Sequence, residues 1–193
     1  MANVKNNLGA QRTRAAIEKV FLELAADLPL RKITVAQIVA ASQISRGTFY
    51  LHYRDVYDLA EKVGEGALDQ LEAELLDSMK DGLDGSGYPF LRILFAYIAD
   101  NRDQVAFVFS PNVPDRTRGR MAKLMQRFST SAIENRFGPI SDEEAMVLRA
   151  YVGSGLFGLV EEWVAGGCPG SPEHMAHLAG CLVTQGYGGI AAG

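Results

Sequence analysis

The stretch TVAQIVAASQISRGTFYLHYR, from Thr34 to Arg54, decides the fold of this chain. Gln37 stands three residues after Thr34, the pattern of a capping box at a helix start, and Ser45 can cap a second short helix. That second helix mixes small, aromatic and cationic residues, which a hydrophobic core would not require. Gly47 within it costs roughly 1 kcal/mol relative to alanine, which favours close approach to something such as a DNA backbone. The stretch therefore predicts a helix-turn-helix that places its second helix in a DNA major groove.

Around this unit, apolar residues recur at helical spacing along the chain. They predict a supporting helix over about residues 10–28, after a frayed polar segment, and a long helix that starts after Asp55 and links the head to the rest. Further helical patterns, separated by Gly and Pro breakers, cover Pro89 to Asp100, Arg102 to Phe109, Arg116 to Phe137, a run capped by Ser141 to about Ala165, and a last helix from Ser171. Residues 186–193 are glycine-rich and predict a disordered tail. Because no stretch alternates with a period of two, we predict an all-α chain, divided into a head at residues 1–54 and a body at residues 55–193.

The charge is distributed unevenly between these two parts. The chain of 193 residues has a formal net charge of −4, but residues 1–60 hold eight Lys and Arg against five Asp and Glu. A basic head on an acidic body suits a protein that touches phosphate with one end only. No run of about 18 apolar residues is present, which predicts no membrane span, and the N-terminus lacks the apolar middle of a secretory signal. The only two cysteines, Cys168 and Cys181, form no disulfide framework, so a reduced cytoplasm is the expected location.

The head also resembles a known family. Its motifs are those of the N-terminal signature of TetR-family (TetR/AcrR) bacterial transcriptional regulators: Ile33-Thr34-Val35, Ile38-Val39-Ala40-Ala41, Ile44-Ser45-Arg46-Gly47-Thr48-Phe49-Tyr50, His52-Tyr53-Arg54 and Leu59. The resemblance covers about residues 12–60, and the length and helical body fit the same family. It implies about nine helices, a homodimer, a DNA-binding domain at residues 1–54 and a ligand-binding and dimerisation domain at residues 55–193. In such proteins, binding of a small-molecule effector usually releases the repressor from its double-stranded DNA operator.

Carried over position by position, the resemblance implies a set of DNA-contacting residues. These are Thr34, Ser45, Arg46, Gly47, Thr48, Tyr50, His52, Tyr53 and Arg54. Thr34 would bond a phosphate at a helix start, and Arg46 is the best candidate to read a guanine, with its neighbours in the helix also meeting base edges. Tyr50, His52 and Tyr53 would grip the phosphate backbone.

Two positions depart from the family pattern. Gln43 stands where the turn commonly has glycine, and it would carry about 1 kcal/mol of strain in a left-handed conformation. Val56 stands where the fourth helix often presents a lysine to phosphate, a loss for which Arg54 would compensate. The plain alternative is that Tyr50 and Tyr53 are packing aromatics and Arg46 is a solvated surface charge, but the full ordered set favours DNA contact.

The middle helices of the body carry aromatic and methionine residues that could line a pocket. The candidates are Tyr97, Phe107, Phe109, Met121, Met125 and Phe128. Core filling is the alternative role for each of them. Since methionine adapts to irregular cavities, we predict a shared pocket for an apolar or aromatic small molecule.

The last two helices are predicted to form the dimer surface. Ala150, Ser154 and Gly158 fall four residues apart and make a small-residue ridge, and the last helix has an apolar stripe. The candidate interface residues are Ser154, Gly158, Trp163, Met175, Leu178 and Leu182. A four-helix bundle made by two subunits would bury them, whereas the alternative is that both stripes close the body's own core.

Three other functions have weaker support in the sequence. His174, His177 and Cys181 share one helix face and are zinc-capable, but no paired short Cys spacing accompanies them, so we expect no metal and no cofactor. An enzyme in the body is disfavoured because the sequence has no nucleophile elbow, phosphate loop or carboxylate pair at a recognisable spacing. A helical interaction module whose head binds protein rather than DNA stays open. We therefore expect the chain to be a ligand-responsive regulator that binds a near-palindromic operator, and not an enzyme.

Overall fold

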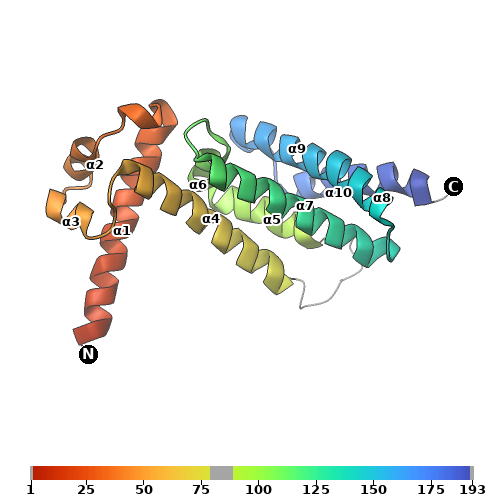
Figure 1. The fold of residues 1–193 in the computed structure, drawn as a ribbon, viewed down its shortest axis with the longest axis horizontal. Helices are drawn as coiled ribbons and strands as arrows, with labels where there is room; N and C mark the ends of the chain where they lie inside the picture. Colours follow the sequence, from red (N-terminus) through yellow and green to blue (C-terminus); the bar gives the residue numbers. More distant parts are fainter. Residues whose placement is uncertain (1, 79–88, 192–193) are drawn as a thin grey trace.

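The computed structural model describes residues 2–78 and 89–191, and every regular element in these ranges is helical (Figure 1). The α-helices are α1 (Ala2–Asp27), α2 (Val35–Ala41), α3 (Arg46–Tyr50), α4 (Val56–Ser78), α5 (Pro89–Asp100), α6 (Arg102–Phe109), α7 (Asp115–Phe137), α8 (Asp142–Leu148), α9 (Ser154–Ala165) and α10 (Pro172–Ala191). A π-helical segment, Arg149–Gly153, joins α8 to α9 in one continuous run. Counting that run once, the described ranges hold nine such helices besides a short 3-10 helix, Leu30–Lys32, and the all-α prediction is confirmed.

The predicted helix starts are formed by the predicted capping residues. The Thr34 hydroxyl accepts a hydrogen bond from the backbone N–H of Gln37, while the Gln37 side chain accepts one from the N–H of Thr34. Ser141 and Glu144 make the same reciprocal pair at the start of α8. Each box satisfies backbone donors that a helix start leaves without an intrahelical partner.

Both ends of the chain are more helical than we predicted. α1 begins at Ala2 rather than near residue 10, and α10 continues to Ala191 through the glycine-rich segment expected to be disordered. Extending a formed helix adds one hydrogen bond for each residue that is ordered, so a helix nucleated elsewhere can run through residues of weak helix propensity.

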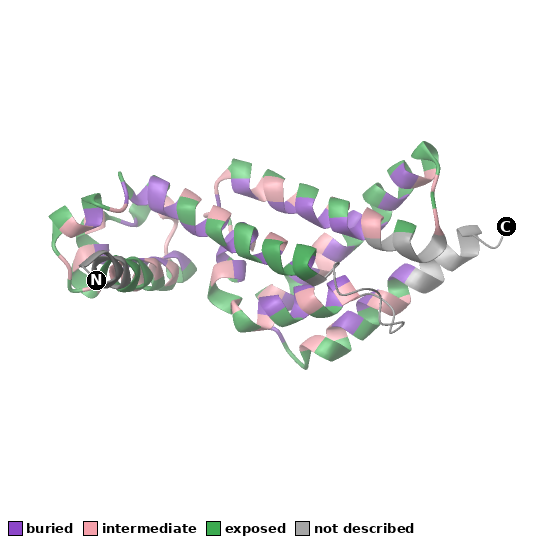
Figure 2. Ribbon diagram, turned by 90° about the horizontal axis from the view of Figure 1, so that it is seen from below, coloured by how far each residue is buried: buried purple, intermediate pink, exposed green. Residues whose placement is uncertain are grey.

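The buried side chains form two clusters, one at each end of α4. Figure 2 shows buried positions along the helices throughout the molecule. The head cluster is built on α1, α2 and α3 around Phe21, Ile38 and Phe49, all fully buried. It also takes in the first turns of α4 and two residues from beyond it, Phe107 and Val113. The body cluster is built from all the helices from α4 to α10, with Val105 and Val108 supplied by α6 and Leu148 by α8. The division at residue 54 stays a prediction, and the head is packed on α4 and α6 rather than tethered by a free linker.

Ion pairs hold α4 against α7. The Arg120 guanidinium lies 2.8 Å from Glu65, 2.6 Å from Asp69 and 2.9 Å from Glu72. Arg127 pairs with Glu72 at 2.6 Å. These partners raise the pKa of Arg120 and lower that of Glu72. Acidic side chains of α4 therefore pair with basic side chains of α7.

Candidate functional site

One face of helix α3 packs against the head, and the opposite face is exposed to solvent. Ser45 caps it by accepting a hydrogen bond from the N–H of Thr48 at 3.0 Å, and Phe49 is fully buried in the head cluster. Arg46 and Gly47 are exposed, and the Tyr50 side chain is 56% exposed. The helix therefore presents a cation, a bare stretch of backbone and a phenol to solvent from a rigid support.

Thr34 also lies at the surface, at the start of α2. Its hydroxyl and its N–H are both used in the capping box, in which the hydroxyl also lies 2.8 Å from the Gln37 carboxamide oxygen. A phosphate at this helix start would accordingly meet the remaining unsatisfied N–H groups of the first turn.

Tyr53 does not lie on the exposed face. It is 2% exposed, and its hydroxyl donates a hydrogen bond to the Glu18 carboxylate of α1 at 2.6 Å. Burial, together with Glu18, raises the pKa of Tyr53. The expectation that Tyr53 grips the DNA backbone is therefore wrong: it belongs to the core of the head. His52 is partly buried and keeps some exposure beside it.

Arg54 is exposed but already paired. Its guanidinium lies 3.0 Å from Asp58, which also accepts the backbone N–H of Arg54 at 2.9 Å and the Lys62 ammonium at 3.0 Å. These donors, the backbone N–H of Arg54 first, lower the pKa of Asp58 to about 2. Val56 is buried in the head cluster, so at that position the chain offers no polar group to phosphate. Compensation by Arg54 stays a prediction.

The turn between α2 and α3 has the strained conformation expected of it. Gln43 has a φ of +55°, the left-handed region that glycine occupies without a steric cost.

Two exposed apolar side chains beside this surface were not in the predicted set. Leu51, at the end of α3, is 83% exposed, and Tyr57, in the first turn of α4, is 60% exposed. The signal for Leu51 was present in the sequence: it stands four residues after Gly47, so both lie on one helix face.

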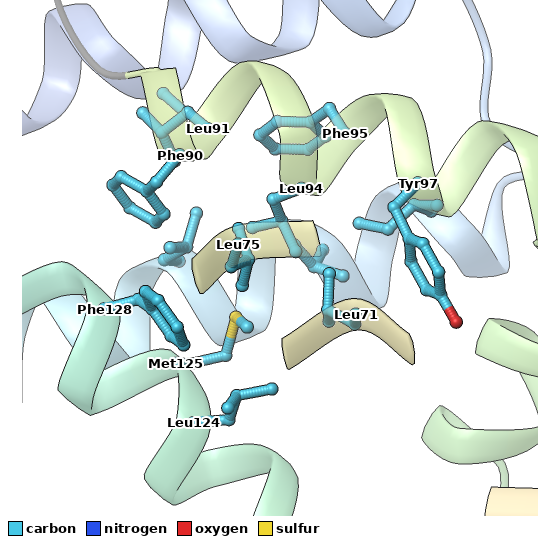
Figure 3. Packing of buried hydrophobic residues seen from close by; sticks show 14 of the residues in the cluster. Leu71, Leu75, Phe90, Leu91, Leu94, Phe95, Tyr97, Leu124, Met125 and Phe128 are labelled. Atoms are coloured by element: carbon cyan, nitrogen blue, oxygen red, sulfur yellow. The ribbon is translucent and has the colours of Figure 1, made fainter. Parts of the chain in front are cut away.

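The predicted pocket residues divide into two groups. Tyr97, Met121, Met125 and Phe128 are all buried in the body cluster. Figure 3 shows Tyr97, Met125 and Phe128 among leucines of α4 and α5. The Tyr97 hydroxyl donates to the backbone carbonyl of Ala67 in α4 at 2.7 Å, and burial raises its pKa to about 12. Of the other two, Phe107 is buried in the head cluster, and Phe109 is partly buried and packs against the body cluster.

Phe107 and Phe109 line a cleft of about 840 Å³ between the end of α1, α6 and the end of α9. Asn112 forms part of its wall and joins the two sides, because its side chain accepts the N–H of Leu30 and donates to the carbonyls of Ala25 and Leu28. This cleft is lined by two of the six candidates and by none of the four in the body core, so a pocket shared by those four stays a prediction.

The predicted dimer residues are mostly at the surface. Ser154, Leu178 and Leu182 are exposed, Leu182 at 69%, while Gly158 and Met175 are partly buried. Trp163 is the exception, and its placement at an interface is wrong. Its ring packs edge to face on Phe95 with centroids 5.2 Å apart, and its Nε1–H donates to the carbonyl of Pro169 at 2.8 Å.

Other exposed apolar side chains extend this surface. Met146, Val147 and Tyr151 are exposed on α8 and the π-helical segment. On α10, the Cys181 sulfur lies 3.6 Å from His177 Nε2. Among the described residues, no three His, Cys, Asp or Glu side chains lie close enough together to hold a metal ion. None of the helices in these ranges is long and apolar enough to cross a membrane.

Comparison with known proteins places the chain among regulators. A TetR-type family model described as "Transcriptional regulator C-terminal region" matches residues 87–185. No curated protein matches the sequence. The fatty acid degradation regulator FadR of Bacillus halodurans is similar in structure, with a TM-score of 0.71 and 13% identity over 89% of this chain and 94% of that one.

Two further solved structures share the fold. A gamma-butyrolactone receptor (ArpA-like protein) has a TM-score of 0.62 and 17% identity over 92% of this chain and 97% of its own. The FadR of Thermus thermophilus, a TetR-family transcriptional repressor solved with lauroyl-CoA, has a TM-score of 0.55 and 18% identity over 90% and 94%.

Proposed function

The chain belongs to the TetR family of transcriptional regulators, and from this premise we propose that it is a homodimeric repressor of a near-palindromic operator, released by an apolar or aromatic small molecule. Each subunit inserts α3 into a major groove, so that the two half-sites lie one or more helical turns apart. Ligand in the body shifts α4 and with it the spacing of the two heads.

The exposed face of α3 is the observation that carries the DNA-binding part of the proposal. Arg46 supplies a fork of donors that matches the two acceptors of a guanine edge, and Gly47 lets the backbone come close. Tyr50 supplies a phosphate contact that is independent of sequence. Tyr53 is not part of this set, because its hydroxyl is committed to Glu18.

Selection of genomic fragments by the purified full chain tests this part. We expect recovery of a near-palindromic site whose affinity falls steeply with salt, as counterion release requires. Arg46→Ala should relax the preference at one base pair in each half-site, with a loss of about 1–3 kcal/mol there. A chain that selects no DNA, or binding that salt does not weaken, would refute the proposal in favour of a protein-binding head.

The dimer rests on the apolar surface of α8, the π-helical segment and α10. Tyr151 and Leu182 lie in water in the single chain, and a four-helix bundle with the same helices of a partner would bury them. A twofold arrangement of the heads would also match a near-palindromic operator.

The effector site is proposed in the body core around Tyr97, Met125 and Phe128. A ligand there would displace the Tyr97 hydroxyl from the Ala67 carbonyl, and Ala67 belongs to the helix that enters the head. The lauroyl-CoA bound by the Thermus thermophilus regulator has an apolar acyl chain, which supports the same class of ligand here.

A thermal-shift screen of fatty acyl and aromatic compounds tests the effector. A ligand that binds only the folded chain at one hundred times its Kd stabilises it by about 2.7 kcal/mol, which is readily seen as a rise in Tm. The same compound should lower operator affinity. If no compound of either class moves the Tm, the proposed ligand class is wrong.

A further inference from the structure

Leu51 is the most exposed of the large hydrophobic side chains in the described part of the chain, at 83%. It sits at the end of α3, and its N–H donates to the Gly47 carbonyl at 3.2 Å, so the two residues are one helical turn apart on the same face. A largely exposed leucine is unfavourable in water, and burying it would be worth on the order of 2 kcal/mol.

The space over Gly47 is empty. A Cβ built on Gly47 would meet only the Ser45 hydroxyl, at 3.6 Å. Helical side chains lean toward the preceding turn, so Leu51 belongs to the same side of α3 as the position that Gly47 leaves bare. The two residues together make a small patch, in which an uncovered backbone position lies beside an exposed apolar side chain.

Polar and cationic groups surround this patch. Arg46 and Tyr50 are its exposed neighbours on α3, and Arg54 follows within one turn. This combination suits a polyanion that also carries an isolated methyl group. In the major groove of DNA, the C5 methyl of thymine is that group, and it lies beside the acceptors that an arginine reads.

We propose that Leu51 is a specificity-determining residue that reads a thymine methyl in each half-site. The proposal rests on the function proposed above and adds to it a second kind of base readout, apolar instead of hydrogen-bonded. Gly47 takes part by leaving room for the methyl against the helix.

Replacing thymine by uracil removes only the methyl group, and this makes the test specific. On the operator selected by the full-length protein, each thymine is changed to uracil in turn and the Kd is measured for the wild type, L51A and L51M. For the wild type we expect one or two positions in each half-site where uracil weakens binding about fourfold, the factor that corresponds to one buried methyl at about 0.8 kcal/mol.

The conclusion depends on whether a substitution at residue 51 abolishes the effect of replacing thymine by uracil. L51A should bind uracil and thymine at that position equally, while L51M, which keeps an apolar side chain, should retain most of the preference. L76A is the matched control: Leu76 is also exposed, but it lies on α4 outside the head cluster, so its variant should show the wild-type uracil effect.

The outcomes separate the two proposals. If the operator binds tightly and no thymine-to-uracil effect depends on residue 51, the readout by Leu51 is refuted while the repressor function stands. If L51A loses solution self-association and keeps its uracil effect, Leu51 contacts a second protein and the inference is also refuted. A chain that selects no DNA refutes both.

Discussion

Asp58 is the residue whose removal should be most informative about the joint between head and body. Its carboxylate accepts the backbone N–H of Arg54 at 2.9 Å, the Arg54 guanidinium at 3.0 Å and the Lys62 ammonium at 3.0 Å. The Asp58 side chain is only 6% exposed, and its pKa falls from 3.8 to about 2. The charge therefore holds the segment that follows α3 against the first turn of α4.

The pKa shift sets the size of the effect. A carboxyl whose pKa is 3.8 in the unfolded chain and about 2 in the folded one contributes about 2 kcal/mol of stability. Because the folded-state pKa of Asp58 is the lower one, this stability is fully present above the unfolded pKa and is lost as the pH falls from about 4 to about 2. Asp58→Asn keeps the size of the side chain and removes its charge, so it should cost about 2 kcal/mol at pH 7 and progressively less below pH 4.

Urea unfolding at a fixed protein concentration, at pH 7, 5, 4 and 3, measures this difference directly. Asp103→Asn is the control, because Asp103 also lies in the first turn of its helix but is exposed, and its variant should lose less than about 1 kcal/mol at pH 7. A loss for Asp58→Asn that stays the same from pH 7 to pH 3 would refute the assignment to charge. A loss below about 0.5 kcal/mol at pH 7 would refute the importance of the network itself.

Three further predictions concern the turn, the two tyrosines and the dimer. Gln43→Gly should raise stability by up to about 1 kcal/mol, seen as a higher Tm, because glycine has no steric penalty at a φ of +55°; a lower Tm would contradict this. Tyr53→Phe should cost about 1–3 kcal/mol of stability and leave operator affinity unchanged, whereas Tyr50→Phe should do the reverse, which unfolding and DNA titration of both variants would reveal. Leu182→Lys should shift a dimer toward monomer in analytical ultracentrifugation while Leu76→Lys does not, and equal behaviour of the two would argue against α10 as the interface.

Local signals explain why the helix starts were predictable. The capping pairs at Thr34 and Ser141 act between residues three apart, so no tertiary contact is needed to recognise them. The position of Tyr53 depends instead on Glu18, which is 35 residues away in the sequence. Tyr50 and Tyr53 have the same chemistry, and only the packing of α1 determines which of them is buried.

The burial of Trp163 could have been predicted from the sequence. Trp163 continues the spacing of Val152, Leu156 and Val160, all of which are buried, so its helical phase predicts a core position. The position of Phe107 could not be predicted in this way, because its ring packs on Phe21 in the head and not within the body. Contacts between the two clusters depend on tertiary structure that helical periodicity does not contain.

Those contacts constrain how the head can move. The ring of Phe107 on α6 meets Phe21 edge to face at 5.1 Å, and Asn112 accepts the N–H of Leu30 at 2.7 Å and donates to two carbonyls at the end of α1, both at 2.9 Å. Each of these hydrogen bonds is worth about 1 kcal/mol, so a rotation of the head on α4 alone would lose a few kcal/mol at this joint. A ligand shifts an equilibrium only by its difference in affinity for the two states. A transition in which α6 moves together with the head keeps the Asn112 contacts and needs a smaller difference, and it is therefore the motion that this structure favours.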